Sequence, residues 1–351
     1  MHWELSEEQQ LFSTSLREWT ASKFPLDTIR GALDTGDSAS FTSALVGEGW
    51  WGVGHPEEDG GEGGGLLELA LASREYSRAA APNSAWLAAA IVAPVLAGDN
   101  LAELVAGERT WVPVVRSDRI PAPGDVSFSE GRISGTIAHV LAASEADVFV
   151  VPILTETGTI VVRADAAAAE ITADRLLDRS RSSATVSFTD APAAILPEQP
   201  DGLAAMATRA AVLVAADALG SCERMLELAV EYSKQRKQFG QFIGSFQAVK
   251  HAAAQMLVTV ESGFSVALYA AAAADAGLDD AATTAAVAKA QVTEHAVESA
   301  DSALTVHGAI GYTWEHELQL HYKRVKLDRV LYGTPASWNE RIAAALLADS
   351  A

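Results

Sequence analysis

The alternation of apolar and polar positions in the first hundred residues predicts helices. Ser6 followed by Gln9 is a capping-box signature for a helix start. A second helix is predicted around residues 40–49, followed by the glycine-rich loop "GWWGVGHPEEDGGEGGG". Helical periodicity then resumes in "LLELALASREYSRAAA". A helical N-terminal domain over residues 1–107 is therefore expected.

The pattern changes to short alternating or β-branched runs between about residues 109 and 195. Examples are "DVFVVPIL" and "GTIVVRA", each bounded by turn residues. Several short strands at this spacing indicate a small antiparallel β-domain rather than βαβ units. We place this middle domain at residues 108–198, with "LPEQPDG" as the linker that follows.

Long alanine-rich segments with helical periodicity fill the rest of the chain, residues 199–351. The predicted helices cover roughly 203–237, 244–276, 279–305, 315–330 and 335–349. Helices of this length with apolar stripes must pack on one another, which predicts a four- or five-helix bundle. The expected fold is thus mainly α with a β middle domain.

Charge and cysteine content narrow the function classes. The 351 residues include 25 Lys plus Arg against 46 Asp plus Glu, a formal net charge of −21, and the basic cluster "KQRKQFG" is too small for a polynucleotide track. Cys222 is the single cysteine, which excludes internal disulfides and fits a reducing compartment. The start lacks the basic and apolar regions of a signal peptide. The most apolar stretches noted fall short of about 18 residues or contain proline, so a cytoplasmic protein without a membrane span is expected.

Other candidate chemistry gives weaker signals. The glycine-rich loop follows no strand and precedes no Lys-Ser/Thr pair, so a phosphate-binding P-loop is disfavoured. No metal site is expected, because the histidines have no HExxH-like spacing and no closed ligand set. Glu315 and Glu317, beside Trp314, are interpreted as packing and capping residues rather than as an acid or base. The histidines considered are His251, His307, His316 and His321.

Four ordered motifs together resemble the acyl-CoA dehydrogenase family over nearly the whole chain. They are "GEGWWGVGHPEEDGG", "ISGTIAHVLAASEADVFVV", "YSKQRKQFGQFIGSFQAVKHAAAQM" and "VHGAIGYTWEHELQLHYKR". The third follows the family pattern at almost every fixed position. The resemblance implies the helical, β, helical architecture, with an N-terminal helical domain, a β-domain and a C-terminal bundle.

The resemblance also implies that FAD binds at a subunit interface. The arginine of "QRKQFG", Arg236, is then expected to reach the pyrophosphate of the neighbouring subunit's flavin, since a guanidinium suits two phosphate oxygens. Phe239 is expected to pack against the adenine, with Phe246 and Gln247 near the same cofactor.

Three further positions complete this predicted cofactor set. Gly308 and Gly311 leave room for another group to approach the backbone. Thr305 replaces the glutamine that the family usually has three residues before the first glycine, which puts one hydrogen bond to FAD in question.

The catalytic base of the family has no counterpart at its usual place. That base is normally a glutamate, which removes the proton next to the thioester carbonyl. In "LYGTPASW" Tyr332 occupies its position, and a phenol with a pKa near 10 is a poor base at neutral pH. A minority of members carry the glutamate about ten residues before a glycine that corresponds to Gly220. Residues 207–214, "ATRAAVLV", contain no carboxylate.

These losses favour a partner role. The family's "TEP..GSD" segment, which holds the flavin ring, also has no counterpart in "TWVPVVRSDRIPAPGD". The pattern resembles the glutamate-lacking subunit of actinobacterial heterotetrameric (α2β2) acyl-CoA dehydrogenases of steroid side-chain degradation. We therefore expect an FAD-dependent acyl-CoA dehydrogenase subunit, active with a catalytic partner chain, with an electron-transfer flavoprotein or similar acceptor. Two alternatives stay open: a homo-oligomeric flavoprotein oxidase or monooxygenase-like relative with a different base, and a structural subunit without flavin.

Overall fold

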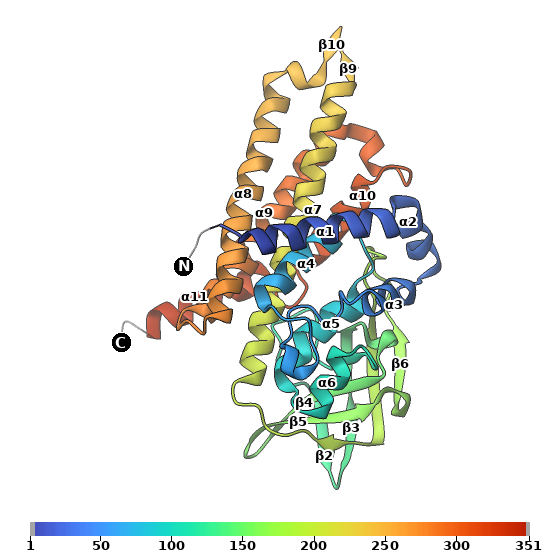
Figure 1. The fold of residues 1–351 in the computed structure, drawn as a ribbon, viewed down its shortest axis with the longest axis vertical. Coiled ribbons are helices and arrows are strands. Elements are labelled where there is room, and N and C mark those ends of the chain that lie inside the picture. Colours follow the sequence, from blue (N-terminus) through green and yellow to red (C-terminus); the bar gives the residue numbers. More distant parts are fainter. Residues whose placement is uncertain (1–3, 349–351) are drawn as a thin grey trace.

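The computed structural model describes residues 4–348 and has the predicted three-part architecture (Figure 1). An N-terminal helical domain packs beside a β-domain, and a C-terminal helical bundle extends away from both. This confirms the predicted fold class. Residue 349, the predicted end of the last helix, lies outside the described residues.

The N-terminal domain is built around aromatic side chains. Its first helix begins with the predicted capping box, in which the Gln9 backbone N–H donates to Ser6 Oγ at 3.2 Å and the Ser6 N–H donates to Gln9 Oε1 at 3.0 Å. Edge-on contacts join Phe41 to Tyr76 and Tyr76 to Trp86. The helices are α1 (Glu7–Lys23), α2 (Leu26–Thr35), α3 (Ala39–Gly47), α4 (Leu66–Arg78), α5 (Ser84–Val92) and α6 (Asp99–Val105), with 3-10 turns η1 (Glu57–Asp59) and η2 (Ala93–Val95).

The middle domain consists of two four-stranded sheets, in the orders β1-β4-β5-β8 and β2-β3-β7-β6. All the strand pairs are antiparallel except β1 with β4, which run parallel in the register Trp111 to Val148. The antiparallel prediction therefore holds with this one exception. The strands are β1 (Trp111–Pro113), β2 (Val126–Ser129), β3 (Arg132–Leu141), β4 (Val148–Thr155), β5 (Gly158–Asp165), β6 (Ala169–Ala173), β7 (Ser183–Pro192) and β8 (Ala194–Ile195), with 3-10 turns η3 (Ala143–Glu145) and η4 (Ala166–Ala168).

The C-terminal domain has five helices with α7 at its centre. Because α7 packs against α4, α8, α9 and α10, it joins the bundle to the N-terminal domain. A hairpin of β9 (Lys237–Gln238) and β10 (Gln241–Phe242) caps the long arm that α7 and α8 form in Figure 1. The helices are α7 (Gly202–Gln235), α8 (Gln247–Asp275), α9 (Ala281–His307), α10 (Leu318–Asp328) and α11 (Pro335–Ala348), with 3-10 turns η5 (Ile243–Ser245) and η6 (Gly308–Tyr312).

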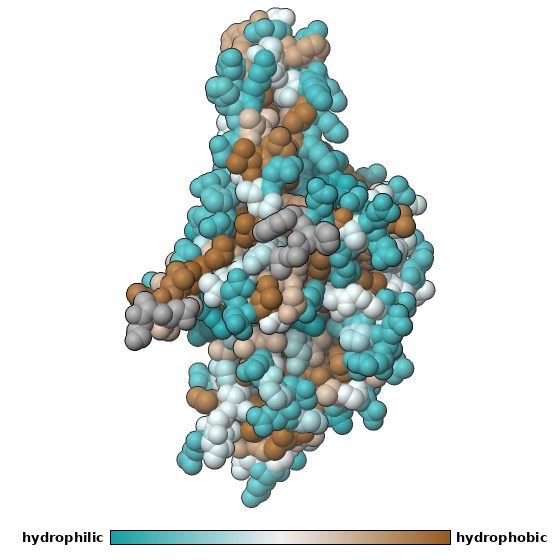
Figure 2. All heavy atoms as spheres, turned by 60° about the vertical axis from the view of Figure 1, so that its left-hand side comes forward, coloured by the Kyte–Doolittle hydropathy of each residue, from teal (hydrophilic) through white to brown (hydrophobic). Residues whose placement is uncertain are grey.

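Two of these helices correct the expectation about apolar length. By length and composition alone, α7 and α8 could each cross a membrane, each with an 18-residue window of mean hydropathy 1.5. That window is 72% buried within the protein in α7 but only 44% buried in α8. Apolar side chains of α8 therefore reach the surface, among them Leu257 and Val258. Figure 2 shows brown, apolar patches along the arm. Both helices pack in the bundle: the mostly buried α7 is part of its core, and the half-exposed α8 forms part of its outer wall.

A fully buried ionic cluster lies where the three domains meet. Arg324 on α10 donates from Nε and Nη2 to the two carboxylate oxygens of Asp217 on α7, at 2.7 and 2.8 Å. Arg181, from the loop between β6 and β7, donates to the same carboxylate at 2.7 Å, and both arginines also bond the Asn83 side chain. Despite burial, the two guanidinium groups hold the pKa of Asp217 well below its usual value.

Candidate cofactor half-site

The tip of the α7–α8 arm presents an aromatic side chain to solvent. Helix α7 ends at Gln235, and the hairpin that follows turns through Phe239 and Gly240, with φ of +51° and +80°. Two-residue hairpin turns with positive φ at both positions match the strand twist but strain any residue other than glycine, asparagine or aspartate. The side chain of Phe239 is 93% exposed. A strained, exposed phenylalanine at a turn marks a contact surface.

Beside this tip lies a cavity of about 520 Å³ that contains three of the seven predicted cofactor residues. Phe239 and Phe246 face each other edge to face, with ring centroids 6.2 Å apart, and Thr305 of α9 lines the same cavity. Gln247, exposed at the first position of α8, directly follows Phe246. The cavity is suited to a flat ring that stacks on aromatic faces.

Arg236 supplies an available cation at the same tip. It is the C-cap residue of α7 and is exposed, and its carbonyl accepts from the Ile243 N–H at 2.8 Å. Within residues 4–348 its guanidinium makes no ion pair or side-chain hydrogen bond. By contrast Lys237, next in sequence, lies over the Phe242 ring at 4.7 Å. Arg236 is therefore free to bind a phosphate group of another molecule.

The two glycines differ in what they require. Gly308, the C-cap of α9, has φ +65°, which only glycine adopts without strain. A Cβ on Gly311 would lie 2.9 Å from side-chain atoms of Leu304 and Leu318. The packing of Leu304 and Leu318 within this chain therefore requires a glycine at position 311.

Tyr332, at the predicted position of the family's glutamate, lies inside the protein. Tyr332 is 1% exposed and adopts φ +54°, and its N–H donates to the Ser117 carbonyl at 2.5 Å. Burial raises the pKa of the Tyr332 phenol above its usual value. The buried Lys289 amine donates to the neighbouring carbonyl of Gly333 at 2.8 Å. These hydrogen bonds therefore hold the loop in place. Because burial raises its pKa, the Tyr332 phenol is a poorer candidate for a base than a phenol in water.

The alternative glutamate position is buried as well. Ala210, Ala211 and Val214 of α7 are each 0% exposed. A carboxylate on this face would enter a packed apolar interior. Neither of the two locations that the family resemblance predicts carries a carboxylate in this chain.

The remaining acidic candidates have structural roles. Glu317, at the N-cap of α10, accepts both guanidinium hydrogen bonds of Arg224 at 2.8 and 2.9 Å. Hydrogen bonds from His321 and Arg224 hold the pKa of Glu317 below its usual range although burial opposes them. No cluster of three or more His, Cys, Asp or Glu that could hold a metal occurs in residues 4–348.

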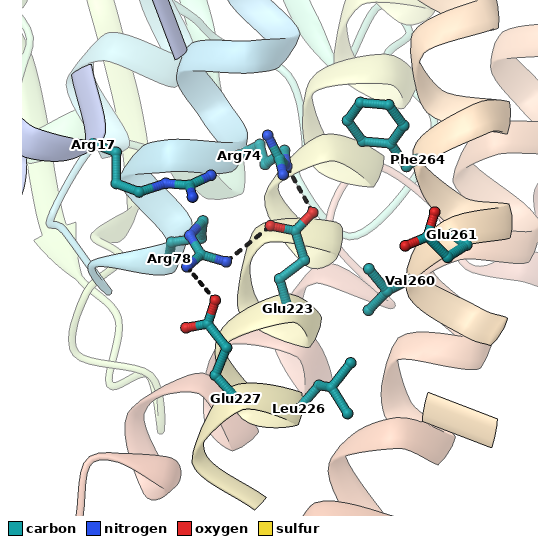
Figure 3. A pocket seen from close by; sticks show the side chains of 9 residues that line it. All are labelled: Arg17, Arg74, Arg78, Glu223, Leu226, Glu227, Val260, Glu261 and Phe264. Atoms are coloured by element: carbon teal, nitrogen blue, oxygen red, sulfur yellow. Dashed lines mark hydrogen bonds and ion pairs between the residues drawn. The ribbon is translucent and has the colours of Figure 1, made fainter. Parts of the chain in front are cut away.

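One feature that the sequence did not suggest is an ionic wall around a second cavity. Figure 3 shows Glu223 of α7 between Arg74 and Arg78 of α4, at 2.7 and 2.9 Å. Arg78 also pairs with Glu227 at 2.6 Å, and these charged side chains line a cavity of about 360 Å³. Each arginine has carboxylate partners, so this wall fastens two domains and leaves no free cation for a ligand.

The order of a helical domain, a β-domain and a helical bundle is that of the three-domain, flavin-dependent dehydrogenase fold. Profiles of the acyl-CoA dehydrogenase N-terminal and C-terminal domains match residues 6–99 and 203–347. The chain belongs to the acyl-CoA dehydrogenase family, whose members bind FAD.

Individual relatives refine this placement. The chain is 32% identical to acyl-CoA dehydrogenase IpdE2 of Mycolicibacterium smegmatis, over 82% of each chain. It is 33% identical to FadE34 of Mycobacterium tuberculosis over 86% of its own length but spans only 41% of that relative.

Two solved structures share the fold. They are the Tcur3481–Tcur3483 steroid ACAD (TM-score 0.88, 24% identity, 98% and 99% of the two chains covered) and the ChsE4–ChsE5 complex of Mycobacterium tuberculosis (TM-score 0.86, 23% identity, 99% of each chain covered).

Proposed function

We propose that this chain is the non-catalytic subunit of a heteromeric FAD-dependent acyl-CoA dehydrogenase. It completes the flavin site of a partner chain that carries the glutamate, and the assembly removes hydrogen from the α and β carbons of a CoA thioester. Bound FAD would supply the acceptor for the hydride. The cofactor half-site of this chain is the set Arg236, Phe239, Phe246, Gln247, Thr305, Gly308 and Gly311.

The observation that carries the proposal is a contrast within one chain. Arg236 and Phe239, which would reach across an interface, are both exposed. The Arg236 guanidinium has no ion pair within the described residues. The position that would act within the chain, Tyr332, is buried and clamped. A free cation beside an aromatic cavity fits a dinucleotide, so the residues present suit FAD.

The names of two similar structures support a proposal for the substrate and the assembly. Two similar structures are named for pairs of chains, and one of them is named a steroid enzyme. We infer an α2β2 heterotetramer, a sterol-derived CoA ester, an electron-transfer flavoprotein or similar acceptor, and a cytoplasmic location.

The test compares matched variants in a complex. The chain is co-expressed with an acyl-CoA dehydrogenase chain that keeps the glutamate, and flavin is measured per complex. Arg236→Ala should lower FAD affinity roughly 10- to 100-fold, the effect of one charged hydrogen-bonding group. Lys234→Ala, on the exposed last turn of α7, is the matched control and should retain flavin. Equal flavin content in both variants would favour the structural subunit instead.

A further inference from the structure

The turn that carries Gly308 and Gly311 folds back against a stack of three rings. His307, the last residue of α9, stacks on Tyr232 of α7, with ring centroids 4.8 Å apart and an interplanar angle of 23°. The ring of His316 contacts His307 edge to face, with centroids 4.7 Å apart. A Cβ on Gly311 would lie 3.1 Å from His307 Cβ, so the turn has little room to shift while the stack is in place.

Hydrogen bonds define where each imidazole of this stack carries its proton. His307 Nδ1 lies 2.8 Å from the Ala303 carbonyl oxygen, which can only accept, so this nitrogen carries the proton. The Leu318 N–H donates to His316 Nδ1 at 3.1 Å, so that nitrogen must keep its lone pair. Because Leu318 is the first residue of α10, the bond satisfies one of the free N–H groups at the start of that helix. The arrangement therefore requires a neutral His316 with its proton on Nε2.

The surroundings of His316 disfavour its protonated form. Burial, followed by the nearby His307 ring, lowers the pKa of His316 below its ordinary value. Arg30 of α2 adds to this lowering of the pKa, and Glu317 opposes it. Both carboxylate oxygens of Glu317, however, already accept hydrogen bonds from Arg224, at 2.8 and 2.9 Å. A positive charge is also unfavourable at the N-terminus of α10, so the ring is stable in the neutral form that its hydrogen bond requires.

Protonation of His316 at Nδ1 would break the hydrogen bond from Leu318 and place a charge against the His307 ring. We propose that His316 is a positioning residue for the half-site: its neutral ring holds the turn of Gly308 and Gly311 in place, and its protonation releases that turn. Because the folded state binds this proton less readily than a free imidazole, which titrates near pH 6.5, the turn is held above that pH and loosens as the pH falls below it. The consequence for a cofactor rests on the proposed function, whereas the release of the turn is a property of this chain alone.

The test follows amide hydrogen exchange in residues 308–317 of the full chain by itself, at pH 7.5 and pH 5.5, corrected for the intrinsic rates. His316→Asn is the informative variant, because an asparagine oxygen can still accept from the N–H two residues on but does not titrate in this range. His251→Asn, which changes an exposed histidine of α8, is the matched control. The ratio of protection between the two pH values is the readout, so a uniform loosening caused by the substitution does not affect it. In wild type and His251→Asn the protection should fall at least about threefold at pH 5.5, and in His316→Asn the ratio should stay near one.

The outcomes separate this inference from the proposed function. A ratio near one in wild type, or the same fall in His316→Asn as in wild type, overturns the role of His316. An equal loss of protection in the buried centre of α7 would reflect global unfolding and would also overturn it. The flavin content of the co-expressed complex tests the proposed function independently. A complex that holds flavin while the wild-type ratio stays near one contradicts only the inference, and a pH-dependent turn without flavin in the complex contradicts only the proposed function.

Discussion

Trp338 donates a hydrogen bond from its indole Nε1 to the carbonyl oxygen of Tyr332, at 3.0 Å. Because Tyr332 stands where the family's base is expected, this bond ties that position to the first turns of α11. Together with the Ser117 and Lys289 contacts, it makes the loop part of the core. In this structure Tyr332 is therefore a packing residue.

Restoring the glutamate should therefore not restore activity. Tyr332→Glu places a carboxylate where the phenol is 1% exposed, and we expect a loss of stability of roughly 2–4 kcal/mol with no oxidation of acyl-CoA by the chain alone. Tyr332→Phe, which removes only the hydroxyl, should stay within about 1 kcal/mol of wild type. Thermal unfolding and dye reduction measure both effects. Turnover by purified Tyr332→Glu would contradict this view of the loop.

We expect the ion pairs of the ionic wall between α4 and α7 to stabilise the protein more than ion pairs on its surface do. Glu223→Gln removes the carboxylate that Arg74 and Arg78 share, and leaves Arg74 paired only with Glu75 at 3.0 Å and Arg78 with Glu227 at 2.6 Å. The loss of this shared charge should cost about 1–2 kcal/mol. Glu261→Gln is the matched control, because Glu261 lines the same cavity, is exposed and has no ion pair among the described residues. Urea unfolding of both variants should show a shift only for Glu223→Gln.

Gly220 marks a close crossing of the same two helices. A Cβ at this position would lie 2.0 Å from the Arg74 carbonyl oxygen, so Gly220→Ala must push α4 away from α7. We expect a loss of at least about 2 kcal/mol. Gly31→Ala in α2 is the opposite case: nothing lies within 4 Å of its Cβ, and it should stabilise by about 0.5–1 kcal/mol. Equal unfolding midpoints for the two variants would refute the crossing argument.

Stability should fall in mild acid because of His55. Burial, and secondarily Arg209, lowers the pKa of His55 to about 4, whereas the unfolded imidazole titrates near 6.5. Between these values the unfolded state binds a proton that the folded state does not, so stability falls as pH drops from about 6.5 toward 4. At pH 5 this contributes a loss of about 2 kcal/mol.

The His55 contribution is isolated by comparison with His55→Gln. The variant lacks this titration, so the stability difference between the two proteins should change by about 2 kcal/mol between pH 7.5 and pH 5. Urea midpoints at both pH values provide the measurement. A difference that does not change with pH would assign the acid sensitivity to other groups.

Much of the fold follows from local patterns. The capping box at Ser6 and the five C-terminal helices were predictable, because periodicity and caps are properties of neighbouring residues. Helices α2, α5 and α6 and strands β6 and β8 were not predicted as separate elements. Helix α2 has an apolar stripe of Leu26, Ile29 and Leu33, but it is only 10 residues long, whereas no buried residue lies in β6. The parallel β1–β4 pair was also missed, since pairing direction depends on distant segments.

The half-site was visible in the sequence only as a motif. The order "QRKQFG" pointed to Arg236 and Phe239, but the cavity exists because α9 brings Thr305 beside the hairpin tip. The wall around Glu223 depends on contacts between segments far apart in sequence. No local pattern records such contacts.

The ratio of flavin to chains in the purified co-expressed complex tests the central claim most directly. Native mass spectrometry gives the number of each chain, and flavin absorbance after denaturation gives the cofactor. We predict one FAD for each pair of different chains, and neither bound FAD nor acyl-CoA oxidation when this chain is purified alone. Stoichiometric FAD on the chain alone, with oxidation of an acyl-CoA, would contradict the account.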